Sequence, residues 1–205
     1  DRPCKYWLHR ISHEWDVSYQ LLSAGYLSIG WAGLAGSGIH DAASHPSIQA
    51  LEAKMLQCGY QLSRSRWSLW NFFQFHAGDY VVVPLFSGAF SIYQVSGAAM
   101  PITQLPDFSD FQSDSGGRIL RSRDGLLCRA DSGTAVDIGF VLPVKPVKER
   151  LSRYEYADSR LTARMKIRQV NADISDLSDS VQKVIRADAP INLYAAIVEE
   201  LAEKL

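Results

Sequence analysis

The stretch 66–97 holds the residues whose types and spacing most suggest binding chemistry. It opens with five rings in nine residues: Trp67, Trp70, Phe72, Phe73 and Phe75. The face of a tryptophan can stack on a nucleic-acid base or hold a methylated amine. Most aromatic side chains are buried for packing, however, and Trp67, Trp70 and Phe73 have the spacing of one face of a short helix. We therefore expect a core face on this helix and keep open a ligand-contacting ring on its other face.

A second signal follows Lys148, where the chain becomes locally basic. Six cations there are candidates for contact with a phosphate backbone: Arg150, Arg153, Arg160, Arg164, Lys166 and Arg168. The acids of the same segment are Glu149, Glu155 and Asp158, so a solvated face of paired charges is the alternative. The whole chain has 21 basic and 22 acidic residues, and no global field draws it to nucleic acid or membrane.

The histidines offer a different chemistry. His40 and His45 lie on either side of Asp41 in a loop, a weak pattern for a metal-dependent hydrolase. Loop histidines without cysteines are more often polar surface, so we expect neither a metal nor a cofactor. The sequence has no Gly-x-Ser-x-Gly, and the triplet 52–54 (EAK) precedes Pro106-Asp107, the reverse of the order in PD-(D/E)xK nucleases. This fragment is expected to bind rather than to catalyse.

The cysteines and the apolar runs bear on the compartment. Cys4, Cys58 and Cys128 are widely spaced and indicate neither a disulfide framework nor a zinc site. No apolar run approaches the roughly 18 residues of a membrane span, so we expect a cytoplasmic protein without a membrane partner. The chain begins at Asp1 rather than Met, and an amphipathic helix is expected at 191–205. We expect a fragment cut between domains, with that helix as a candidate homodimer interface.

The elements that must position these residues start with a hairpin. Two β-rich runs, 80–86 and 89–95, are joined at Ser87-Gly88. Residues 80–83 are apolar without a break, which predicts a strand covered on both faces. Pro84 cannot donate to a ladder and predicts a strand end, a bulge or an edge.

Other elements follow from periodicity and caps. Strands are expected at 5–12 and 26–31, on either side of a helix at 15–22 with Asp16 as its N-cap and Gly25 as its stop. Further predictions are a helix at 47–58, an irregular excursion at 101–125, strands at 126–130 and 136–147, and a helix at 156–165. The short steps between elements predict an α+β fold, a small β-barrel with flanking helices. We expect this barrel at 1–147 and a helical extension and linker at 148–205.

Several short motifs resemble a known family. They are YWLHRI at 6–11, GYLSIGW at 25–31, GDYVVVP at 78–84 with FSIYQV at 90–95, and RLTARMKIRQ at 160–169. Together, over residues 5–175, they resemble the N-terminal region of Mrr-like restriction proteins, which is similar to the EVE and YTH branch of PUA-like folds. The resemblance implies a sensor that takes a flipped-out, modified base into an aromatic cage. It also implies a restriction or phage-defence protein whose nuclease domain lies beyond residue 205.

The resemblance also implies site residues. In the family, the cage uses an aromatic just after the second strand and others from the segment before the Gly-Asp strand, which correspond here to Trp31, and to Trp67 or Trp70. The base edge would be read by Asn71, Ser12 or Ser28, because amides and hydroxyls match the donors and acceptors of a base. The insertion at 101–125 departs from the family and leaves one pocket wall undefined.

The favoured function is therefore a nucleic-acid-binding module that recognises a modified base in DNA. One alternative is a metal-dependent hydrolase that uses His40, Asp41 and His45. The other is a protein-interaction or dimerisation module.

Overall fold

The computed structural model describes residues 2–11, 14–41, 47–105, 111–192, 197 and 201–202. The chain divides into two compact units. The terminal unit comprises Asp1–Arg10, Gly78–Gln94 and Lys145–Leu205, and the central unit comprises Ile11–Ala77 and Val95–Val144. This division differs from the one expected after residue 147, because the segment from Lys145 onward packs with the first strand and the hairpin.

The terminal unit is organised around a mixed sheet. Its strands follow the order β10 (Asn171–Asp173), β1 (Tyr6–His9), β3 (Tyr80–Pro84), β4 (Ala89–Val95) and the C-terminal half of β9 (Phe140–Ser152). β1 and β3 are parallel, whereas β1 with β10 and β3 with β4 are antiparallel. Helices α5 (Ser159–Lys166) and α6 (Ser178–Arg186), with the short α4 (Arg153–Tyr156) and η5 (Ser175–Leu177), complete the unit.

The hairpin predicted from the sequence is confirmed. Val81, Val82 and Val83 are fully buried, as the unbroken apolar run requires, and β3 ends at Pro84. The connection is longer than Ser87-Gly88 alone, because the Leu85 N–H donates to the Ala89 carbonyl at 2.8 Å around a 3₁₀ turn. Ser87 lies there in the left-handed region, with φ 57°.

The helix expected at 156–165 is confirmed as α5, although it begins later. The Asp158 carboxylate accepts a hydrogen bond from the Leu161 N–H at 2.9 Å and caps the helix. Leu161 and Met165, four residues apart, pack into the same core as Val181 and Val184 of α6. The helix expected at 191–205 lies mostly outside the described residues.

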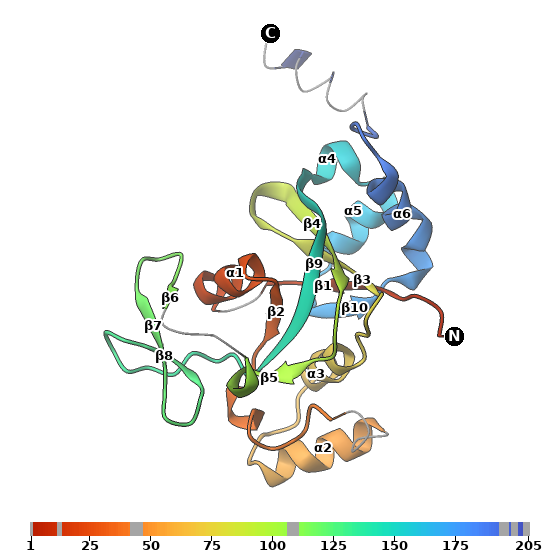
Figure 1. Ribbon diagram of the computed structural model, residues 1–205. Helices are drawn as coiled ribbons and strands as arrows, with labels where there is room; N and C mark the ends of the chain where they lie inside the picture. The colour runs from red at the N-terminus through yellow and green to blue at the C-terminus, as the bar shows by residue number, and fades with distance from the viewer. Residues whose placement is uncertain are drawn as a thin grey trace. The chain divides into compact units, whose positions relative to one another are not determined.

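The central unit combines helices with two sets of strands. Its helical segments are α1 (Trp15–Ser23), η1 (Ala32–Leu34), α2 (Ile48–Gln57), α3 (Arg66–Phe73) and η4 (Ile102–Gln104). β2 (Tyr26–Ile29) and β5 (Met100–Pro101) each pair antiparallel with the N-terminal half of β9. A separate antiparallel sheet contains β6 (Phe111–Gln112), β7 (Arg118–Arg121) and β8 (Leu127–Arg129), and it is visible as a small group of strands in Figure 1.

Two predictions for this unit were wrong. Residues 101–125 are not wholly irregular, because β5, η4, β6 and β7 lie there and Ile119 is buried in the core. Asp16 is not the N-cap of α1: Glu14 occupies that position, and Asp16 lies inside the helix. Asp16 is buried instead, and both its oxygens accept hydrogen bonds from Arg129, at 2.8 and 3.0 Å.

Other predictions hold. The helix expected at 47–58 is confirmed as α2, which the Ser47 hydroxyl caps and after which Gly59 has φ 82°. The chain turns at Gly25 after α1, with φ 93°. The α+β class is confirmed. Within the described residues, no helix combines the length and the apolar character needed to cross a membrane.

Candidate ligand pocket

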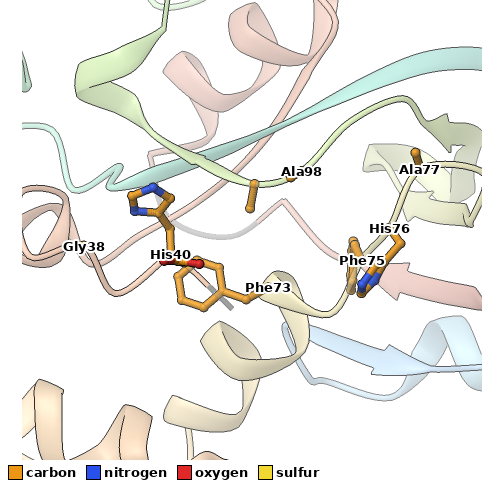
Figure 2. A pocket seen from close by; sticks show the side chains of 9 residues that line it. Gly38, His40, Phe73, Phe75, His76, Ala77 and Ala98 are labelled. Carbon is orange, nitrogen blue, oxygen red and sulfur yellow. The ribbon is translucent and has the colours of Figure 1, made fainter. Parts of the chain in front are cut away.

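The central unit contains an open pocket with a volume of about 770 Å³. That volume falls within the roughly 300–1,000 Å³ typical of small-molecule sites. Its lining residues come from three separate segments of the chain: Gly38, His40, Asp41, Phe73, Phe75, His76, Ala77, Ala98 and Ala99 (Figure 2). Those segments are the loop after η1, the end of α3 with the residues that follow it, and the loop after β4.

Two phenylalanines form the buried part of the pocket lining. Phe73 is the last residue of α3, and after the cap at Gln74 the chain continues to Phe75. Both rings are buried, at 7% and 2% exposure. Phe73 meets Phe140 of β9 edge to face, and Phe75 contacts Phe72 with centroids 5.7 Å apart. These contacts fix two apolar rings in place, as a stacking site needs.

His40 brings a polar ring to the lining. Its side chain is half-buried, and its Nδ1 is buried with no hydrogen-bond partner among the described residues. Burial lowers the pKa of His40, and the charge of Asp41 offsets this only in part. The imidazole is therefore neutral at pH 7. A buried N–H without an acceptor is costly, so we place the proton on Nε2, which makes that atom a donor.

His76 is an exposed part of the lining, and it is oriented by its own backbone. Its Nδ1 lies 2.6 Å from the Gln74 carbonyl oxygen. A carbonyl only accepts, so Nδ1 carries the proton and donates to it, and in the neutral ring Nε2 is an acceptor. The lining thus brings a donor imidazole and an acceptor imidazole together with buried phenyl rings. This combination suits a planar heterocycle that carries both acceptors and donors on its edge.

The three tryptophans expected to form a cage lie outside this lining. Trp67 is 46% exposed and lies beside the guanidinium of Arg66, whose Cζ is 5.9 Å from the ring centroid. Trp70 is half-buried. The core face of α3 is formed by Leu69, Phe72 and Phe73, so the expectation that Trp67 packs in the core was wrong.

Trp31 follows β2, as the resemblance requires, and has an unusual backbone. It is half-buried and lies in the left-handed region with φ 60° and ψ 48°. A bulky residue there costs about 1–2 kcal/mol. Gly139 packs against it so closely that a Cβ on the glycine would lie 2.3 Å from the Trp31 carbonyl oxygen. Trp31 does not line the pocket at His40.

The expected base-reading polar residues also lie outside the pocket lining. Ser28 is buried on β2, at 6% exposure, and Asn71 is half-buried within α3. Ser12 lies outside the described residues.

The six cations expected to contact phosphate fall into different environments. Arg164 is paired with Asp176 through two hydrogen bonds, at 3.2 and 2.8 Å, and Arg160 donates to the Asp176 carbonyl at 3.3 Å. For Arg164, the structure therefore favours the alternative to phosphate contact, a charge paired with a nearby acid. Arg150, Lys166 and Arg168 are exposed, and Arg153 is half-buried. We find no carboxylate paired with these last four in the part of the chain that the structure describes.

Two of the three residues of the alternative metal site are described by the structure. His40 and Asp41 both line the pocket, whereas His45 lies outside the described residues. Among the residues that are described, no group of three or more His, Cys, Asp or Glu side chains is placed to hold a metal ion.

The sequence contained one signal for the pocket that was not used. Phe73, Phe75 and His76 belong to the same aromatic run as the tryptophans, but they lie at its end, where α3 gives way to a turn and a loop. In the sequence, the loop position of His40 indicates a metal ligand or polar surface. A neutral imidazole beside phenyl rings equally suits the edge of a base.

Comparisons of the chain with protein-family models, with curated proteins and with solved structures found no match.

Proposed function

We propose that the chain is a nucleic-acid-binding module that takes one base, in the favoured case a modified base of DNA, into the pocket at His40 and Phe73. The observation that carries this proposal is the lining itself: two fixed phenyl rings and two imidazoles around about 770 Å³ of open space. A planar, partly polar group is the ligand class that such a lining serves best.

The energetics are compatible with base capture. Extruding a base from a duplex costs a few kcal/mol, and less when the base is mismatched or damaged. Stacking on an aromatic ring contributes about 1–3 kcal/mol per base. A hydrogen bond between the edge of the base and His40 or His76 adds selectivity, because a ligand without the matching group leaves the imidazole nitrogen unpaired.

Asp41 is the charged residue of the lining, and it sets a preference. It is exposed, so it does not forbid a ligand by desolvation. A carboxylate accepts hydrogen bonds only, and it favours amino groups or a partial positive charge on a base over a carbonyl or a phosphate. We therefore place the base rather than the backbone at this pocket.

The wider assignment rests on the motifs. The PUA-like fold and a role as specificity domain of a restriction or phage-defence protein follow from the resemblance to Mrr-like proteins. The cytoplasmic setting follows from the widely spaced cysteines and the short apolar runs. The α+β architecture is compatible with them. In this proposal the chain itself performs no catalysis, and cleavage belongs to a separate nuclease domain.

The experiment is a binding titration of duplexes that differ at one base. Labelled duplexes with and without a methylated cytosine or adenine are compared by fluorescence anisotropy, with wild type, His40→Ala, His76→Ala and a control, Trp67→Ala, outside the pocket. The proposal expects tighter binding of one modified duplex by wild type and Trp67→Ala, and loss of that preference in both histidine variants. Equal binding of all duplexes by wild type would overturn it, and so would a preference that survives both histidine substitutions.

A further inference from the structure

The terminal unit carries a second set of rings, exposed rather than buried. Phe86, at the start of the β3–β4 turn, is 63% exposed, and Tyr154 of α4 is 49% exposed. The two segments are neighbours: a Cβ built on Gly88 would lie 3.2 Å from Cε2 of Tyr154. Figure 1 shows this turn beside α4. Large rings exposed on adjacent elements of one unit make a surface rather than a scattered pair.

One arginine side chain lies directly against these rings. The Arg153 guanidinium lies over the Tyr154 ring, with Cζ 5.2 Å from its centroid, and Nη2 donates to the Tyr154 hydroxyl at 3.2 Å. Burial is the main cause that lowers the pKa of Arg10, and the positive charge of the nearby Arg153 lowers it further. Arg10 uses its own N–H groups on the carbonyls of Met165, Ile167 and Gln169.

These arginines are not neutralised locally. The neighbouring carboxylates, Glu149 and Glu155, form no ion pair with Arg150 or Arg153 within the described ranges. Arg153 also retains a buried Nε with no hydrogen-bond partner there. In contrast, the arginine beside the exposed Trp67 is neutralised, because Arg66 is paired with Glu52. An aromatic ring next to an unneutralised guanidinium attracts an anion that carries a flat group.

The backbone at this surface is held in costly conformations. Ser87, between Phe86 and Gly88, has φ 57°, and Arg150 has φ 52° within β9. The Arg150 N–H donates to the hydroxyl of the buried Ser91 at 3.0 Å, which fixes this irregularity against β4. A left-handed residue inside a strand is typical of a bulge, and bulges redirect side chains at the edges of sheets and beside sites.

We propose that a surface at the tip of the hairpin binds single-stranded nucleic acid. This hairpin-tip surface consists of Phe86, Tyr154, Arg150 and Arg153. In this arrangement the two rings stack on bases, and the guanidiniums contact the phosphates between them. The chemistry is sequence-tolerant, because every base has a stacking face. This binding does not depend on the pocket or on any base modification.

The test uses an unmodified, labelled oligothymidine single strand and fluorescence anisotropy at low salt, with a series of salt concentrations for wild type and the arginine variants. Phe86→Ala and Tyr154→Ala should each weaken binding about fivefold or more, in keeping with the loss of one stacked base. Tyr154→Phe should bind within about twofold of wild type, because the ring remains. Charge reversal of Arg153 should weaken binding and flatten its salt dependence, whereas charge reversal of Arg164, already paired with Asp176, should do so less.

One matched control separates this surface from the rest of the chain. Trp67→Ala removes an equally exposed ring beside an arginine that is already neutralised, and it should leave the affinity unchanged. Wild-type affinity in both Phe86→Ala and Tyr154→Ala would overturn the inference. Equal loss in Trp67→Ala, or tighter binding of an unmodified duplex than of the unmodified single strand by wild type, would overturn it as well.

Discussion

The ring of Phe73 meets the ring of Phe140 edge to face, with centroids 5.1 Å apart and planes at 87°. Phe73 ends α3 and Phe140 begins β9, so this contact ties the pocket lining to the strand that pairs with β2 and β5. The pocket is thus built on a fixed packing contact, and its binding properties can be separated from its stability by the choice of substitution.

Substitution of Phe73 tests that separation. Phe73→Ala should destabilise the fold by about 3–5 kcal/mol, because a nearly buried ring leaves a cavity. Phe73→Leu keeps most of the apolar volume and should cost less than about 2 kcal/mol. We expect Phe73→Leu to remain folded in chemical denaturation while losing affinity for the base-containing ligand. Unchanged affinity in a folded Phe73→Leu variant would contradict a role for this ring in binding.

The depressed pKa of His40 makes stability depend on pH. Because burial lowers the folded-state pKa, the unfolded chain binds more protons than the native chain below pH 6.5. The contribution of His40 to the free energy of unfolding is therefore fully present above the unfolded pKa. It is lost as the pH drops from about 6.5 towards the folded pKa. Urea denaturation at a series of pH values should show this slope in wild type.

The control for this prediction removes the titration and keeps a polar side chain. His40→Gln should have a smaller slope than wild type between pH 6.5 and pH 5, with the other histidines unchanged. Identical pH profiles for the two proteins would show that His40 is not the group responsible.

The pair formed by Asp16 and Arg129 governs acid stability. Hydrogen bonds from Arg129, opposed by burial, lower the pKa of Asp16 from 3.8 to about 2. The carboxylate thus contributes stability above pH 3.8 that is lost as the pH falls towards 2. The contribution at neutral pH is on the order of 2 kcal/mol.

Asp16→Asn should unfold at lower urea concentration than wild type at pH 7, and the two should converge near pH 2. The Arg129 partner Glu14 also accepts from it, at 2.7 Å, so part of the bridge survives in this variant. A difference between the two proteins that persists undiminished at pH 2 would contradict the assignment.

The turn at the hairpin tip offers a stabilising substitution. Ser87 has φ 57°, a conformation that costs an ordinary residue about 1 kcal/mol and costs glycine nothing. Ser87→Gly should therefore raise the free energy of unfolding by about 0.5–1 kcal/mol, measured by chemical denaturation. Destabilisation would show that the Ser87 side chain makes a contribution larger than this strain.

Much of the fold could be predicted from local pattern. The run at Val81, Val82 and Val83 predicts a buried strand because three consecutive apolar β-branched residues have no solvent face. Pro84 correctly marks the end of that strand. The helix predicted at 47–58 is present as α2, with the Ser47 hydroxyl as its cap and a left-handed Gly59 after it.

Other features could not be predicted because they depend on long-range contacts. In α3 the five apolar residues of RWSLWNFF allow more than one apolar face, and packing selects Leu69, Phe72 and Phe73 rather than Trp67. Asp16 looks like a cap locally, and only the fold brings Arg129 to it from 113 residues away.

The pocket lining is of the same kind. His40, Phe73 and Ala98 come from segments without a shared sequence pattern, and the resemblance pointed instead to Trp31, Trp67 and Trp70. Residue type suggested an aromatic site in this part of the chain, but the particular rings follow from where α3 ends.

The most direct test of base binding at the pocket is an NMR titration that observes the imidazole rings of His40 and His76. A methylated nucleoside and its unmodified counterpart are added in parallel. Base capture predicts that both imidazoles shift in a saturable manner, at lower concentration for the methylated nucleoside, while the ring signals of Trp67 stay in place. Saturable binding that leaves His40 and His76 unshifted, or no binding of either nucleoside, would contradict it.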